Sequence, residues 1–273
     1  MHDIRFGRSW LVPVLAICLG SIGLATAPEP ALTKEQMKVF LAQAKVTASK
    51  HTKKGITDPW VLTLTDGKTT HQGVFQAIDE HRPSKQFADG HSEINFVDSY
   101  KYNIAAYNLS ELLGIDDMIP VYVERKWQGN AGSISWLVSV MMDEQERLDK
   151  KLSSPNADAW NRQMYKLRVF DELVYDTDPN LTNVLIGDDW KVWRVDFSRA
   201  FRLSKDVQSV KNLDHCERGL FEKLKALDAA ELTRRTKDLL SKPEIQALMS
   251  RRDKIVAYIQ KRIAESGEVS VLY

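Results

Sequence analysis

Apolar residues recur at helical spacing in two stretches of the first half of the chain. Thr33-Lys-Glu-Gln36 has the form of a capping box and predicts a helix with one apolar face, made of Met37, Phe40, Leu41 and Ala44. The charged run at residues 50–55 is expected to end this helix as a solvated linker. A second helix is expected after Asp98, because apolar positions within residues 104–113 keep the same spacing and Gly114 can stop it.

Strand-like patterns lie on both sides of the second helix. Residues 60–64 and 69–78 surround a turn at Asp66-Gly67 and predict a hairpin. Residues 119–125 and 133–140 predict two more strands, separated by a glycine-bearing turn at residues 129–132. The polar stretch at residues 79–96 shows no period and is expected to be irregular.

The remainder of the chain is mainly helical by pattern. One long helix is predicted from a shared apolar face, made of Trp160, Met164, Leu167, Phe170 and Val174. Capping boxes at residues 228–231 and 241–244 predict two further helices. Short β-rich runs at residues 183–186 and 191–197, joined by Gly187-Asp188-Asp189, interrupt the helices as a hairpin. We therefore expect an α+β protein with a strand-rich part followed by a helical part.

The first residues have the pattern of a secretory signal. Arg5 and Arg8 precede an apolar run at residues 10–25, which is shorter than the roughly 20 residues of a membrane span and contains Pro13. Residues 1–27 are therefore interpreted as a signal peptide or, because Pro28 hinders cleavage, as an uncleaved N-terminal anchor. In either case we expect export of the domain, with membrane contact only through this segment.

Composition narrows the class of protein. The 273 residues are 43% hydrophobic and 27% charged, which indicates a globular chain long enough for one large domain or two lobes around a cleft. The net charge of +1 gives no field that favours nucleic acid. Without residues 1–27, Cys216 is the only cysteine, which excludes an internal disulfide and a multi-cysteine zinc site and favours a buried thiol.

The histidines His71, His81 and His91 form no compact metal-binding motif and are expected at the surface.

Three polar residues around the late hairpin have the chemistry of phosphoryl transfer. Asp178 can orient a hydroxyl or accept its proton, while Asn183 and Asp196 offer oxygen ligands to a magnesium ion on a triphosphate. The alternative interpretation is a surface turn at Asp178 and a capping role for Asp196. Their setting favours function, because Asp178 follows a long amphipathic helix and Asp196 ends a β-rich run.

With these residues in this order, the chain resembles the atypical kinases, a group that includes phosphatidylinositol kinases, the HipA toxin kinases and the secretory-pathway Golgi casein kinases. Within this group it resembles a bacterial-type member. The resemblance rests on ordered pieces between Trp60 and Leu203, among them Tyr102-Asn-Ile-Ala-Ala-Tyr107, Leu112-Leu-Gly114, Thr177-Asp-Pro-Asn-Leu-Thr-Asn183 and Val195-Asp-Phe-Ser198. It implies a two-lobed protein-kinase-like fold, with an N-lobe at residues 58–140 and a C-lobe at residues 141–266. Residues 28–57 then form a preceding helix and linker. The resemblance also implies ATP in the interlobe cleft with Mg²⁺ or Mn²⁺.

Two positions depart from that pattern. Such kinases carry a Lys on the strand after the hairpin and a Glu on the next helix, and the matching residues here are Gln76 and Asn103. A neutral pair makes weaker hydrogen bonds to phosphates than the usual ion pair. Lys85 or Lys101 is the alternative phosphate ligand, although neither falls on a predicted strand.

Three functions follow. The first is a metal-dependent, ATP-using phosphotransferase that acts on a hydroxyl of a protein, lipid or sugar. The alternative is a pseudokinase-like module that binds nucleotide or acts as a scaffold without catalysis, motivated by Gln76 and Asn103. The third is an exported interaction domain that uses the fold only as a shape.

Overall fold

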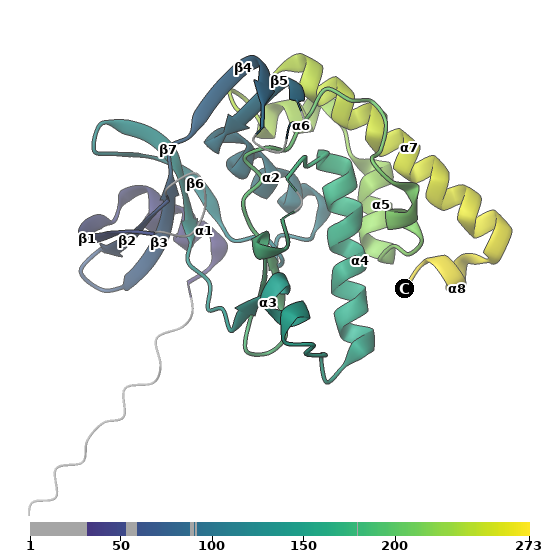
Figure 1. Cartoon of the computed structure of the whole chain (residues 1–273), viewed down its shortest axis with the longest axis horizontal. Coiled ribbons are helices and arrows are strands. Elements are labelled where there is room, and N and C mark those ends of the chain that lie inside the picture. The colour runs from purple at the N-terminus through teal and green to yellow at the C-terminus, as the bar shows by residue number, and fades with distance from the viewer. Residues whose placement is uncertain (1–31, 53–58, 88–89, 91, 179) are drawn as a thin grey trace, which may run out of the picture. The chain divides into compact units, whose positions relative to one another are not determined.

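An antiparallel sheet of five strands dominates the first half of the chain in the computed structural model, which describes residues 32–52, 59–87, 90, 92–178 and 180–273 (Figure 1). In sheet order the strands are β1 (Lys45–His51), β2 (Trp60–Thr65), β3 (Thr70–Gln76), β7 (Asn130–Trp136) and β6 (Tyr122–Trp127). The predicted hairpin at Asp66 is confirmed, because β2 pairs with β3 and the Asp66 carboxylate accepts hydrogen bonds from the Lys68 and Thr69 amides at 2.9 and 2.7 Å. The two later strands are also confirmed, as the pair β6 and β7.

Helix α1 (Lys34–Gln43) begins at the predicted capping box. The Gln36 amide donates to Thr33 Oγ1 at 3.2 Å, and the Thr33 amide donates to Gln36 Oε1 at 2.8 Å. The expectation that this helix continues to the charged run is wrong, since strand β1 starts at Lys45 and pairs along its length with β2. β1 is an edge strand with mostly exposed side chains, so its sequence is polar and lysine-bearing and lacks an alternating pattern.

A separate hairpin occupies the stretch that was expected to be irregular. Strands β4 (Asp79–Gln86) and β5 (Ser92–Ser99) form a two-stranded sheet, in which Asp79 pairs with Ser99 and Gln86 with Ser92. Most side chains of both strands are exposed or half-buried. Because no face of β4 is buried, period-two alternation is absent there, and the sequence could not indicate the strand.

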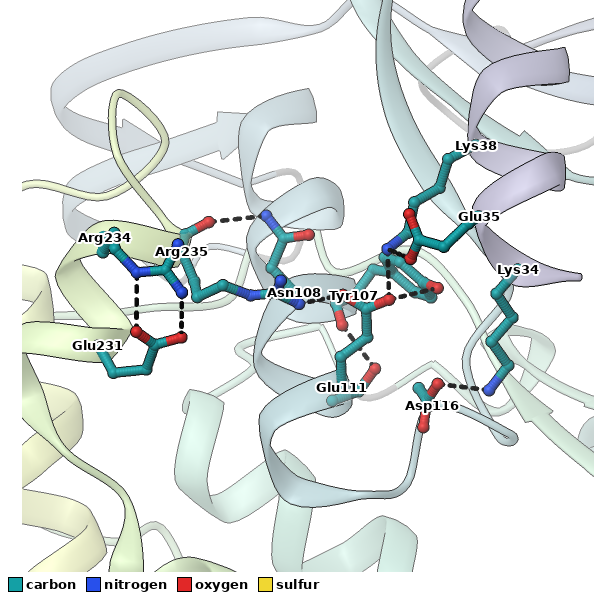
Figure 2. A network of polar contacts seen from close by, with 11 residues as sticks. Lys34, Glu35, Lys38, Tyr107, Asn108, Glu111, Asp116, Glu231, Arg234 and Arg235 are labelled. Atoms are coloured by element: carbon teal, nitrogen blue, oxygen red, sulfur yellow. Dashed lines mark hydrogen bonds and ion pairs between the residues drawn. The ribbon is translucent and has the colours of Figure 1, made fainter.

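Helix α2 (Tyr100–Leu113) is confirmed, with Ser99 as its N-cap and Gly114 at its end in the left-handed conformation, φ +69°. Its Glu111 connects two other helices, as Figure 2 shows: the carboxylate binds Lys38 of α1 and Arg235 of α6 (Ala229–Arg235). Asn108 adds a hydrogen bond to the Arg235 carbonyl at 2.9 Å. α2 is therefore linked to α1 on one side and to α6 of the helical part on the other.

The helical part is built around α4 (Ala157–Val174) and α7 (Lys242–Ser266), which contact each other. α5 (Arg218–Ala226) and α6 also pack on α7, and the short helices are α3 (Glu144–Asp149), α8 (Glu268–Val271), η1 (Leu181–Asn183) and η2 (Val210–Leu213). The predicted capping box at Ser241 and Glu244 is present, and Asp228 caps α6 by accepting from two backbone amides at 2.9 Å. Cys216 is buried and free, as predicted, and burial raises its pKa to about 12.

A small antiparallel sheet lies among these helices. Its order is β10 (Val192–Arg194), β9 (Val184–Ile186) and β8 (Met142–Asp143), so the predicted late hairpin is confirmed and gains one strand. In the part of the chain that the structure describes, none of the helices is both long enough and apolar enough to span a bilayer.

Candidate functional site

A cleft of about 320 Å³ opens between the five-stranded sheet and the small sheet. Its first wall comes from β2, β3 and β7, and includes Val61, Val74, Gln76 and Ser133. Its second wall comes from η1, β9 and the segment after β10, and includes Asn183, Leu185 and Asp196. Leu137 and Val138, which follow β7, also line it. The cleft therefore combines apolar walls with a group of polar side chains.

Gln76 and Asn103 lie together although 26 residues separate them in the sequence. Asn103 Nδ2 donates to Gln76 Oε1 at 2.8 Å, and Asn103 Oδ1 accepts from the Phe197 amide at 2.6 Å. Asn103 is fully buried on α2, while Gln76 ends β3 and lines the cleft. This neutral pair therefore joins β3, α2 and the segment that follows Asp196.

Asn183 and Asp196 are brought to the same wall of the cleft. The Val195 amide donates to the Asn183 carbonyl at 3.0 Å, which ties η1 to the segment after β10. Asp196 has φ +59°, a left-handed conformation that is uncommon for a residue other than glycine. Its Oδ1 atom is buried and has no hydrogen-bond partner among the described residues. A carboxylate oxygen and an amide oxygen in this position fit the hard oxygen ligands that Mg²⁺ and Mn²⁺ prefer.

Asp178 lies in the turn just before this wall and is half-buried. The Asn180 amide donates to the Asp178 carbonyl at 2.7 Å, and the Asp178 amide donates to Asp176 Oδ1 at 3.0 Å. Among the described residues, the lining of the cleft includes Thr182 and Asn183 but not Asp178. Asp178 therefore does not line the cleft, although it lies in the turn that leads into η1 and Asn183.

Arg194 and Asp176 form a buried ion pair that links these two segments, each side chain being only 1% exposed. Arg194 also donates to the carbonyl of Val195, and at 3.5 Å to that of Asp196. Burial is the main cause that raises the pKa of Asp176. Arg194 and the hydrogen bond from the Asp178 amide oppose the rise, whereas the charges of Asp178 and Asp196 add to it. The pair thus fixes the backbone next to both candidate site aspartates.

Sequence reasoning did not find Arg194, Asp176 or the neighbouring Asp171. The sequence did hold one indication of Arg194. Arg194 lies on the same face of its strand as the buried Val192, and a charged residue on a buried strand face needs a partner. The partner lies 18 residues earlier in the sequence, so the pairing itself could not be read from spacing.

The two alternative lysines are bound outside the cleft. Lys85 lies on β4, contrary to the expectation that it is not on a strand; its ammonium binds Glu80 at 3.1 Å and lies 4.0 Å from the centre of the Phe96 ring. Lys101 binds Asp79 at 3.2 Å. Neither lysine contributes to the lining.

In the part of the chain that the structure describes, no three His, Cys, Asp or Glu side chains are arranged to hold a metal ion. His71 is half-buried rather than at the surface: it stacks on Trp136 with ring centres 3.6 Å apart and contacts the Leu137 carbonyl at 3.0 Å. His81 is exposed and pairs with Asp79 at 3.1 Å, while His91 lies outside the described residues.

Comparison with known proteins identifies the fold. The chain is similar to a hydra Fam20 solved with sugar, with a TM-score of 0.62, 14% identity, and coverage of 88% of this chain and 91% of that one. It is similar to the Golgi casein kinase with Mn/ADP bound (TM-score 0.59, 13% identity, 88% and 78% covered) and to the Helicobacter pylori proinflammatory kinase CtkA (0.53, 10%, 83% and 98%). Neither a family model nor a curated protein matches the sequence.

The expected fold class is therefore confirmed. The chain has an atypical kinase-like fold, in which the strand-rich part is the N-lobe and the helical part is the C-lobe.

Proposed function

We propose that this protein is a metal-dependent phosphotransferase that moves the γ-phosphoryl group of ATP to a hydroxyl of a protein, lipid or sugar. The observation that carries the proposal is the position of Asn183 and Asp196 on one wall of a cleft in a kinase-like fold. The Mn/ADP bound to the similar Golgi casein kinase supports the same choice of ligands.

In this proposal the apolar walls hold the base of the nucleotide. Val61 and Val74 on one side and Leu185 on the other offer a slot for a flat heterocycle. Leu137 and Val138, rather than Met141 or Met142, are the residues of the connecting segment that face it, since neither methionine lines the cleft.

Asn183 and Asp196 would hold the divalent cation through their side-chain oxygens. Such a cation neutralises charge on the triphosphate and on the transferring group. The buried Oδ1 of Asp196 supports this role, because an ionised carboxylate oxygen without a partner is costly in the protein interior.

Asp178 would accept the proton of the attacking hydroxyl. The new bond joins the substrate oxygen to the γ-phosphorus, the bond from that phosphorus to the bridging oxygen of ADP breaks, and the hydroxyl proton passes to the Asp178 carboxylate. Because Asp178 does not line the cleft, the substrate hydroxyl would lie outside the nucleotide pocket. Asp176 orients it through the hydrogen bond to the Asp178 amide.

A second candidate is a nucleotide-binding module without catalysis, and the Gln76–Asn103 hydrogen bond favours it. Gln76 could offer the phosphates only a neutral hydrogen-bond donor, because the pair carries no positive charge. This candidate predicts stabilisation by nucleotide without turnover.

Transfer of radiolabelled phosphate from ATP tests the choice. With Mg²⁺ or Mn²⁺, the full chain is expected to label itself or a member of a panel of proteins, lipids and sugars, and Asp178→Asn and Asp196→Asn should abolish labelling. Asp188→Asn is the matched control, since Asp188 is exposed in the turn between β9 and β10. Nucleotide binding without labelling would support the second candidate, and absence of both would leave an interaction domain that only shares the shape.

Export is part of the proposal. It is supported by the signal-like pattern of residues 1–27, which lie outside the described residues, and by the similarity to a Golgi kinase. Fractionation of source cells tests it: the protein is expected outside the cytoplasm, and a cytoplasmic pool would contradict export.

A further inference from the structure

Asp98 is a buried carboxylate that no sequence pattern assigned to the site. It lies near the end of β5, just before the N-cap of α2, and is 8% exposed. Two hydrogen bonds hold this junction against the segment that follows Asp196. The Ser99 amide donates to the Ser198 carbonyl at 2.8 Å, and the Phe197 amide donates to the Asn103 side chain, at Oδ1, at 2.6 Å. The Asp98 carboxylate itself accepts a hydrogen bond from the Ser198 side chain.

Asp98 and Asp196 each have one oxygen without a partner. Both Oδ1 atoms are buried and receive no hydrogen bond from the described residues. The two carboxylates lie on segments that the hydrogen bond from the Ser99 amide to the Ser198 carbonyl holds together. A buried carboxylate oxygen without a hydrogen-bond partner is unfavourable unless a cation lies with it.

The nearby cations of the protein are engaged by other groups. Lys85 binds Glu80 at 3.1 Å, and Arg199 binds Glu93 on β5. Neither donates a hydrogen bond to the Asp98 Oδ1 atom, although Arg199 Nε is also buried without a partner. The Oδ1 atoms of the two aspartates are therefore not satisfied by any described residue.

We propose that Asp98 is a further ligand of the divalent cation, which it holds together with Asp196. The inference rests on the proposed function, because Asp196 is assigned there to the metal. Two carboxylates, an amide oxygen from Asn183 and the phosphate oxygens of a nucleotide form an all-oxygen set that suits Mg²⁺ or Mn²⁺ rather than Zn²⁺.

The inference is tested by measuring the binding of Mn²⁺ to the full chain in the presence of ADP. The decrease of the free Mn²⁺ signal in electron paramagnetic resonance reports the binding. Asp98→Asn keeps the shape of the side chain and is expected to weaken Mn²⁺ binding about tenfold or more. Asp79→Asn is the matched control: Asp79 begins the same hairpin but its carboxylate binds Ser99 and Lys101, so Mn²⁺ binding should stay within about twofold.

A second measurement separates a ligand from a structural carboxylate. Without metal, Asp98→Asn removes a charge beside Asp196, so its melting temperature should equal or exceed that of the wild type, while the rise caused by Mn²⁺ and ADP should shrink. A variant that melts lower without metal yet keeps the full rise would overturn the inference. Asp98→Ser, which retains a polar group beside Ser198, answers the same question if the amide variant does not fold.

The outcomes also distinguish the inference from the proposed function. If Asp196→Asn loses Mn²⁺ binding while Asp98→Asn retains it, the proposed function stands and the inference is wrong. If the wild type binds no Mn²⁺ with ADP, both fail.

Discussion

Asn103 donates a hydrogen bond to Gln76 across 2.8 Å, at the two positions where the resemblance to kinases implies a charged pair. The contact joins the same elements, the end of β3 and the body of α2, but with neutral groups. Asn103 is fully buried and also holds the Phe197 amide next to Asp196. This side chain therefore has a structural role that is independent of any contact with phosphate.

Asn103→Ala should destabilise the protein. The substitution leaves the Phe197 amide and the Gln76 carbonyl oxygen without this partner in the interior, which costs about 1–3 kcal/mol. Urea denaturation measures the free energy of unfolding. The control is Gln145→Ala, on the exposed face of α3, which should change it by less than about 0.5 kcal/mol. Equal effects of the two substitutions would contradict the role of Asn103.

Arg194→Met tests the buried ion pair between the two candidate site segments. Removal of the guanidinium leaves the Asp176 carboxylate buried and uncompensated, so we expect a loss of about 3–5 kcal/mol in unfolding free energy. Arg162→Met removes an exposed ion pair with Asp158 and should cost at most about 1 kcal/mol. The account of Arg194 fails if its variant is as stable as the Arg162 variant.

Asp171 gives a pH dependence whose sign follows from its environment. Burial, opposed by Arg194, raises its pKa to about 7, above the value of 3.8 in an unfolded chain. The folded state therefore binds more protons than the unfolded state between about pH 4 and pH 7, and the contribution of this group to stability falls as the pH rises through that window. Its side chain keeps 29% exposure, which moderates the size of the effect.

Asp171→Asn removes this titration. The stability of the variant relative to the wild type should increase steadily from pH 4 to pH 7 and then level off, as followed by urea denaturation at a series of pH values. A difference that stays constant over the whole range would show that the pKa of Asp171 is not raised in the folded protein.

Glu111 is expected to stabilise the position of α2. Glu111→Gln removes the charge that binds both Lys38 and Arg235 (Figure 2), and because the Glu111 side chain is 14% exposed we expect a loss of about 1.5–3 kcal/mol. Glu231→Gln is the control, since its pair with Arg234 is exposed to solvent and should contribute little to stability. Thermal melts of both variants measure the difference, and indistinguishable melting temperatures would contradict it.

Local signals explain which elements the sequence could predict. The capping box at Thr33, the glycine at position 114 and the polar turn at Asp66 act within a few residues, and each places an element boundary where the structure has it. Strands β1 and β4 lack such signals, because an edge strand and a hairpin without a buried face need no apolar alternation.

The candidate site likewise has a part that the sequence could predict and a part that it could not. Asn183 and Asp196 belong to one hairpin region, so spacing was enough to bring them together on one wall of the cleft. The contacts of Arg194 with Asp176, and of the Asp98 junction with Ser198, depend on how distant segments pack. Pattern and spacing carry no information about such pairs when a single sequence is read.

The most direct test of the central claim is a crystal structure of the full chain with Mg²⁺ and a non-hydrolysable ATP analogue. The account predicts the nucleotide in the cleft between the two sheets, with side-chain oxygens of Asn183 and Asp196 at about 2.0–2.1 Å from the metal. A nucleotide bound elsewhere, or a metal that neither side chain contacts, would contradict it.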